Sequence, residues 1–171
     1  FITIPEISLD NETKNEFSKS IANAAIHVAI NDRFGREIPK VSSSLNEGLA
    51  TQEDDQGRIR QLNAEIRNIM RNRSLSNVVD VLNASKTNSP SEYSQAHFLG
   101  LFLLSLDKDE NQSYQNYGKM LSASIENYDK DISESIIKWD RTINEIYGRY
   151  GIRDVSELQA AWIKWLRGFF S

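Results

Sequence analysis

Large apolar residues recur at helical spacing between Tyr114 and Tyr150. The intervals between successive members are three or four residues throughout, so one face of a continuous helix would stay apolar from end to end. At about 1.5 Å of rise per residue, such a helix would be roughly 55 Å long. We therefore expect a single long helix over about residues 110–150 that organises the rest of the chain. Residues 129–131 are the favoured site of a kink, because three charges crowd one turn there. The pattern consists of Tyr114, Tyr117, Leu121, Ile125, Tyr128, Ile132, Ile136, Trp139, Ile143, Ile146 and Tyr150.

Shorter stretches of the chain also show helical periodicity. Residues 1–9 alternate apolar and polar but contain Pro5, so we expect an extended arm rather than a strand of a sheet. A stripe of Phe17, Ile21, Ala24 and Val28 then predicts a first helix. Further along we expect a polar connector at residues 37–51, which has room for a short helical turn, and then an arginine-rich helix at 52–73. A short apolar segment at 78–82, a central helix at 91–106 that is apolar nearly all round, and an aromatic helix at 154–170 complete the prediction.

Composition agrees with an all-α fold in one domain that spans residues 1–171. The chain has 171 residues, of which 39% are hydrophobic, enough for a single domain to bury a core. Only three prolines and eight glycines stand beside 26% charged residues, a balance typical of helices and not of a β-sandwich or barrel. We predict an elongated bundle of five or six helices organised around the long helix.

The expected C-terminal helix carries more apolar surface than a helix at a chain end needs. Trp162, Trp165 and Phe169 belong to one apolar stripe and Phe170 to a second, and together the stripes cover most of the circumference. A surface this apolar must be covered by something. The core of the chain can cover one stripe. The second can face a protein partner, a second copy of the chain, a membrane surface or further chain downstream of residue 171. We predict that these four aromatic residues contact a protein partner, with packing inside the core alone as the alternative.

A second candidate surface consists of arginines on the expected helix at residues 52–73. Arg60, Arg67 and Arg71 are spaced seven and four residues apart and so share one helix face. Guanidinium groups in such an array can bind phosphate groups. Two alternatives need no ligand. The basic helix can dock beside residues 107–134, which carry seven acidic and three basic side chains, or the arginines can form a simple solvated face.

No group of residues points to catalysis or metal binding. The chain has no cysteine and two histidines, His27 and His97, each in an apolar helix without an acidic residue at the helical neighbour positions. A hydrogen-bonded structural histidine is the simpler interpretation of both. Residues 107–113 resemble the start of a calcium loop, but Gln112 and Gly118 stand where that loop requires glycine and glutamate. We expect no enzymatic activity, no cofactor and no metal site.

Charge and hydropathy narrow the classes of partner. A formal net charge of −4 argues against nucleic acid as a partner of the whole molecule. No run reaches the roughly 18 apolar residues that a membrane span requires. The chain begins at Phe1 rather than at a methionine and lacks cysteine, from which we expect a piece of a larger or membrane-anchored protein with an extracytoplasmic or envelope location.

These observations favour a non-catalytic interaction or scaffolding domain that binds a protein partner, or a second copy of itself, through apolar helix surface. Two alternatives stay open. One is phosphate or nucleic-acid binding through Arg60, Arg67 and Arg71. The other is a membrane-interacting toxin or envelope protein that engages lipid through the C-terminal helix. No small-molecule substrate is inferred.

Overall fold

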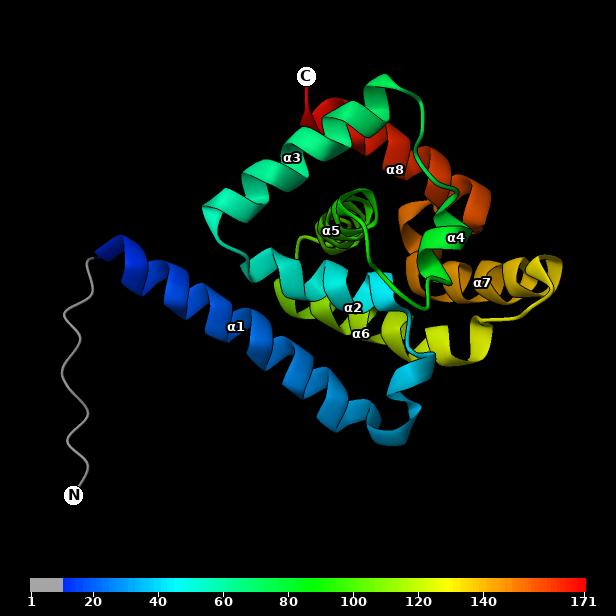
Figure 1. Cartoon of the computed structure of the whole chain (residues 1–171). Helices are drawn as coiled ribbons and strands as arrows, with labels where there is room; N and C mark the ends of the chain where they lie inside the picture. Colours follow the sequence, from blue (N-terminus) through cyan, green and yellow to red (C-terminus); the bar gives the residue numbers. More distant parts are fainter. Residues whose placement is uncertain (1–10) are drawn as a thin grey trace.

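The computed structural model describes residues 11–171, with side chains from residue 18 onward, so the predicted extended arm at residues 1–9 lies outside the described residues. The described part of the chain is all-α and contains no strand. Its helices are α1 (Asn11–Phe34), α2 (Ser43–Ala50), α3 (Gln56–Arg71), α4 (Val78–Leu82), α5 (Pro90–Ser105), α6 (Glu110–Asn127), α7 (Ile132–Tyr147) and α8 (Val155–Phe169). Three short 3-10 helices, η1 (Gly35–Lys40), η2 (Thr51–Glu53) and η3 (Gly148–Tyr150), follow α1, α2 and α7 (Figure 1).

The central helix of the fold is α5. It is seen nearly end-on in Figure 1, with α2, α3, α6 and α8 packed around it. Its start is set by local chemistry, because the Ser89 hydroxyl accepts a hydrogen bond from the Glu92 backbone N–H while the Glu92 carboxylate accepts one from the Ser89 backbone N–H. Pro90 occupies the first turn, and every residue from 94 to 100 is buried. The predicted central helix at residues 91–106 is therefore confirmed.

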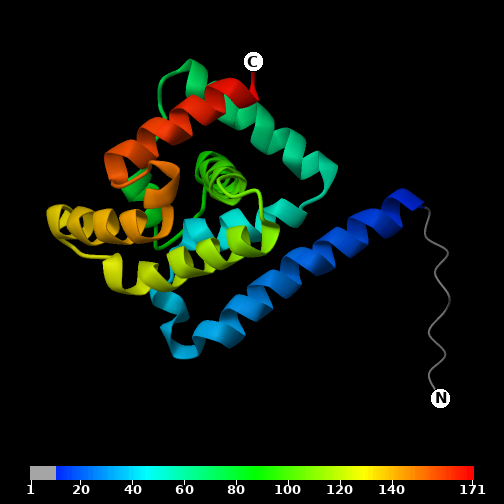
Figure 2. The ribbon, with the colours of Figure 1, turned by 180° about the vertical axis from the view of Figure 1, so that it is seen from behind.

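The prediction of one continuous helix over residues 110–150 is wrong. The chain forms two helices there, α6 and α7, separated by a turn at residues 128–131, and α7 turns back to pack against α6 (Figure 2). Tyr128 has extended backbone angles, with φ −61° and ψ 128°. Asp131 starts α7 by accepting a 2.9 Å hydrogen bond from the Ser133 backbone N–H. The break falls at the charged residues where a kink was expected.

The apolar period continues across this break because both helices turn a face to the same core. Tyr117 of α6 and Trp139 of α7 are buried, whereas Tyr128 and Ile132 at the break are 53% and 46% exposed. A period of apolar residues reports which face is apolar, and it does not report whether the helix is continuous. The organising position in the fold belongs to α5 and not to a long helix at residues 110–150.

The predicted polar connector at residues 37–51 contains a buried helix, α2. Ser42 caps this helix, because its hydroxyl accepts a 3.3 Å hydrogen bond from the Leu45 backbone N–H. Leu45 is 1% exposed, and Gly48 allows α2 to cross α5 in close contact at Gly100. The described residues form eight α-helices instead of the five or six predicted for the chain. The difference arises because α2 and α4 are helices of their own and because α6 and α7 are separate.

Candidate functional site

Polar side chains attach α1 to the rest of the molecule. The Asn23 Nδ2 donates 2.9 Å hydrogen bonds to the backbone oxygen of Ala50 and to Oδ1 of Asp54. One turn later, His27 Nδ1 lies 3.0 Å from Oδ1 of Asn46. Residues four apart share one face of a helix, so Asn23 and His27 mark the face by which α1 docks on α2 and η2.

Two close contacts at this junction bring titratable groups together. His27 Nε2 lies 3.8 Å from Oε2 of Glu47, and Arg58 Nε lies 4.0 Å from Oδ2 of Asp54. Burial raises the pKa of Glu47, against the opposing effect of His27, and burial also raises the pKa of Asp54. These contacts connect α1 and α3 to the segment between them, so they are docking contacts of the fold.

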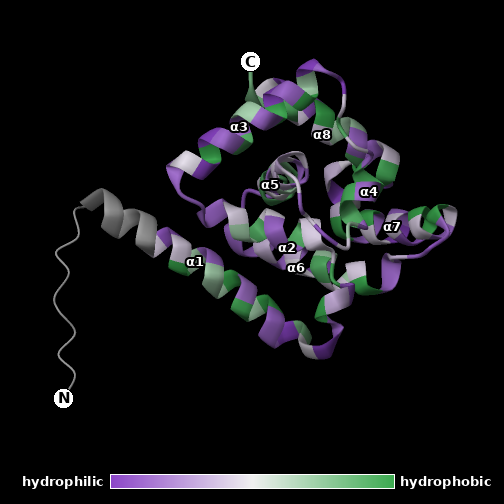
Figure 3. Cartoon of the chain, viewed as in Figure 1, coloured by the Kyte–Doolittle hydropathy of each residue, from purple (hydrophilic) through white to green (hydrophobic). Residues whose placement is uncertain are grey.

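The apolar residues Ile21, Ala24 and Val28 of α1 face away from the molecule. Ile21 and Val28 are 54% and 65% exposed, and Ala24 is exposed as well. Figure 3 shows hydrophobic residues, in green, recurring along the described side chains of α1. A surface helix of a globular protein normally turns its apolar stripe to the core. Here Asn23 and His27 share the docking face with Ile30 and Phe34, which pack in or against the core, and a second apolar line, Ile21, Ala24 and Val28, is left to solvent.

An apolar groove, the α1–α6 groove, lies on the opposite side of α1 from that stripe, because its lining residues Ile26 and Ile30 stand about half a turn around the helix from Ile21 and Val28. It has a volume of about 860 Å³. Its rim carries three charged residues, Arg33 of α1 and Lys119 and Glu126 of α6. Tyr114, at one end of the α6 wall, is 46% exposed. The apolar lining consists of Ile26, Ala29, Ile30 and Phe34 of α1, Leu49 of α2, and Tyr114, Leu121 and Ala123 of α6.

Gly118 leaves part of the α6 wall of this groove without a side chain. A Cβ placed on Gly118 would meet no atom within 4 Å, and the residue lies inside the regular helix α6. A larger side chain at this position therefore occupies space in the α1–α6 groove without straining the backbone. Position 118 is thus the place where a single substitution can fill the groove.

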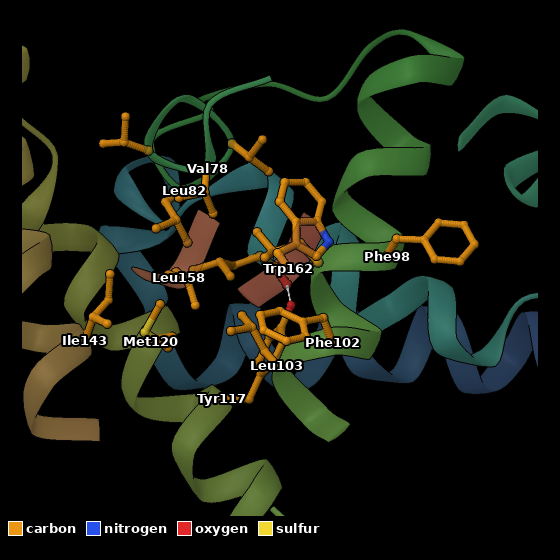
Figure 4. Close-up of a cluster of buried hydrophobic side chains, with 14 of the residues drawn as sticks. Val78, Leu82, Phe98, Phe102, Leu103, Tyr117, Met120, Ile143, Leu158 and Trp162 are labelled. Atoms are coloured by element: carbon orange, nitrogen blue, oxygen red, sulfur yellow. Dashed lines mark hydrogen bonds between the residues drawn. The ribbon is translucent and has the colours of Figure 1, made fainter. Parts of the chain in front are cut away.

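The tryptophans of α8, predicted as partner contacts, pack in the chain's own core. Trp162 is 0% exposed and lies in the cluster of buried side chains with Leu158 and Phe102 (Figure 4). Trp165 is partly buried, with its ring centroid 5.8 Å from that of Phe102. In this conformation Trp162 offers no surface to a partner.

The two terminal aromatic residues of the prediction are more accessible. Phe169 is 49% exposed, although its ring lies 5.6 Å from the ring of Phe98 on α5. Phe170 is partly buried, 5.4 Å from the same Phe98 ring. The guanidinium carbon of Arg67 lies 4.8 Å from the centre of the Phe170 ring, a cation–π contact between α3 and the end of α8.

The predicted arginine face of α3 is divided by the structure. Arg60, Arg67 and Arg71 are all exposed, but only Arg67 and Arg71 line a cleft between α3 and α8, together with Arg167 and Phe170. Of the two alternatives without a ligand, docking of α3 beside the acidic segment is not the observed packing, whereas the exposed arginines are compatible with a solvated face. The helix α3 lies on α5, and within residues 18–171 no ion pair joins these arginines to a carboxylate.

His97 has a structural environment. It is 3% exposed, and its Nδ1 lies 3.1 Å from the Thr51 hydroxyl. Burial lowers the pKa of His97 to about 4.

Across the described part of the chain, no cluster of three or more histidine and acidic side chains is placed to hold a metal ion. No helix there has the length and hydropathy to cross a bilayer.

The groove and the exposed stripe were not predicted as sites. The sequence pattern assigned Tyr114 and Leu121 to one continuous apolar face and Ile21 and Val28 to another, with nothing to say which face would be covered. The available signal was the pair Asn23 and His27, four residues apart on the face that also carries Ile30 and Phe34, away from the first stripe. No protein-family model, curated protein or solved structure matches the chain.

Proposed function

We propose that this chain is a non-catalytic protein-interaction domain, and that an amphipathic helix of a partner protein binds in the α1–α6 groove. The observation that carries the proposal is the groove itself, about 860 Å³ in volume, with apolar walls from Ile26 and Ile30 of α1 and Leu121 of α6. Burial of apolar surface favours association by roughly 25 cal/mol per Å² before the costs of binding. A partner helix that covers the apolar lining of the groove gains this contribution.

The exposed stripe of Ile21 and Val28 is a separate surface. It lies on the opposite side of α1 from Ile26 and Ile30 of the groove, so one partner helix cannot contact both. Recognition of a helix in a groove uses apolar residues at three- and four-residue spacing. Arg33 and Lys119 outnumber Glu126 at the rim, which favours a partner helix with acidic residues beside its apolar face.

The test fills the groove at Gly118 and follows the partner by site-specific crosslinking. A photo-crosslinking residue at Ser122, inside the groove, is introduced into the full chain in its native cells, and the crosslinked peptides are identified by mass spectrometry. We expect crosslinks to a helix of another protein with apolar residues at helical spacing. Gly118→Leu should abolish them. Gly168→Leu is the matched control, because a Cβ on Gly168 also meets no atom within 4 Å and Gly168 lies outside the groove.

Three outcomes would overturn the proposal. Crosslinks to the same chain alone would replace the partner with a second copy, and light scattering would then show a dimer. Crosslinks that persist in Gly118→Leu would place the contact outside the groove. A chain that is monomeric and yields no crosslinks in its native cells would remove the interaction itself.

A further inference from the structure

The cleft between α3 and α8 gathers three arginines over an apolar floor. Its volume is about 410 Å³, and it is lined by Arg67, Met70, Arg71, Leu166, Arg167 and Phe170. The two helices lie next to each other in both ribbon views (Figures 1 and 2). No carboxylate is among the lining residues, so the cleft concentrates three positive charges on a chain of net charge −4.

The donor groups of these arginines are available for a ligand. Within residues 18–171, the Arg67, Arg71 and Arg167 side chains take part in no ion pair and no hydrogen bond, unlike Arg58, Arg149 and Arg153. Arg67 stacks on the Phe170 ring at 4.8 Å, and this contact restrains the guanidinium while leaving its N–H edges unused. Like charges held close together repel. An anion in the cleft therefore reduces the repulsion among the three arginines and also accepts hydrogen bonds from them.

We infer that the α3–α8 cleft binds a phosphoryl group carried on an apolar body. A phosphate monoester brings about two negative charges at neutral pH and several acceptor oxygens, which match the fork-shaped donors of arginine. Met70, Leu166 and Phe170 offer apolar contact to the rest of the molecule. Nucleic acid is disfavoured, because a bound strand would follow the whole basic face of α3, whereas Arg60 lies outside the cleft. The inference is independent of the proposed partner helix, which binds at α1 and α6.

Phenyl phosphate tests the inference, since it joins a phosphoryl group to one apolar ring. Its binding to the full chain is followed by NMR of the arginine Nε–Hε signals, with inorganic phosphate and benzoate as comparison ligands. We expect saturable binding that is at least tenfold tighter than for either comparison ligand. Arg71→Gln and Arg167→Gln should each weaken the binding of phenyl phosphate about tenfold. Phe170→Leu should lower the affinity for phenyl phosphate to nearly the affinity for inorganic phosphate. Arg60→Gln, an exposed arginine of the same helix outside the cleft, should change it less than twofold.

A second arm identifies the source of the phosphoryl group. Co-sedimentation with vesicles that contain phosphatidic acid, lost in Arg71→Gln and kept in Arg60→Gln, would assign the cleft to a lipid headgroup. Phenyl phosphate binding without sedimentation would assign it to a soluble ligand. The inference is overturned if no saturable binding occurs, if benzoate binds as tightly as phenyl phosphate, or if Arg60→Gln weakens binding as much as Arg71→Gln. All four substituted residues are exposed or only partly buried, so unchanged circular dichroism serves as the folding control.

Discussion

Gly48 of α2 and Gly100 of α5 meet backbone to backbone where the two helices cross. A Cβ on Gly100 would lie 2.5 Å from the backbone oxygen of Gly48, and a Cβ on Gly48 would lie 2.5 Å from the backbone oxygen of Ala96. The obstacle in each case is backbone, which cannot move aside as the end of a long side chain can. Close approach at this crossing is what lets α2 pack on the central helix.

Gly100→Ala should therefore destabilise the fold. We expect a loss of about 3 kcal/mol in the free energy of unfolding, at the upper end of the usual range for overpacking, because two helices must separate to admit the methyl group. Urea denaturation followed by circular dichroism measures the change. Gly118→Ala is the control and should stabilise the fold by about 0.5–1 kcal/mol, since its Cβ meets nothing within 4 Å and alanine favours a helix. Equal effects of the two substitutions would contradict the close crossing.

The C-terminus of α3 offers a stabilising substitution. Arg73 has φ 54°, in the left-handed region, and the backbone N–H of Ser74 donates a 3.0 Å hydrogen bond to the oxygen of Ile69. This is the helix-ending motif that usually carries glycine at the left-handed position. Arg73→Gly should raise the free energy of unfolding by about 1 kcal/mol, because glycine adopts this conformation without steric cost.

Two controls separate backbone strain from charge at this position. Arg73→Ala removes the charge but keeps a Cβ at positive φ, so it should not raise the free energy of unfolding. Asn72→Gly places glycine at a residue whose φ is −85° and should not stabilise the fold. A gain in Arg73→Ala as large as in Arg73→Gly would show that charge, and not strain, is responsible.

Two buried tryptophans differ in one hydrogen bond and should differ in their sensitivity to substitution. Trp139 and Trp162 are both 0% exposed, but Trp139 Nε1 donates a 2.8 Å hydrogen bond to Oδ1 of Asn83, whereas Trp162 Nε1 has no partner among the described residues. Trp139→Phe should lower the free energy of unfolding by about 1 kcal/mol more than Trp162→Phe, because it also leaves the Asn83 oxygen without its donor. Chemical denaturation of both variants measures the difference, and equal costs would mean that this bond adds no net stability.

The stability of the fold should fall in mild acid because of His97. Burial lowers the pKa of His97 from 6.5 to about 4, so between these values the unfolded chain binds a proton that the folded chain does not. Stability from this group is complete above about pH 6.5 and is lost as the pH falls toward 4. The loss between pH 7 and pH 5 amounts to about 2 kcal/mol.

His97→Gln isolates this contribution from other titrating groups. The variant keeps a polar side chain without a proton equilibrium, so its free energy of unfolding should fall by about 2 kcal/mol less than that of the natural chain between pH 7 and pH 5. Denaturation curves at the two pH values give the comparison. Identical falls in both proteins would show that His97 can take up a proton in the folded state.

Local chemistry along the chain determined much of this structure before any tertiary contact is considered. The scarcity of proline and glycine and the helical spacing of apolar residues determined the all-α class, and a nearly uniform apolar run determined that the helix at residues 91–106 is central. Charge crowding at residues 129–131 predicted a kink where one helix in fact ends. The continuous apolar period did not indicate that a separate helix begins after it. Caps and spacing act over three or four residues, so they can be read directly from the sequence.

The tertiary structure alone decided which surfaces meet and which remain open. It turned Asn23 and His27 of α1 toward the body and left Ile21 and Val28 outside, and it placed Arg167 of α8 beside Arg67 of α3. These outcomes depend on contacts between residues far apart in the chain, where the shape of a neighbouring helix selects one docking face among several. Periodicity specifies that a face is apolar, but packing decides what covers it, and the candidate interaction surfaces follow from that second decision.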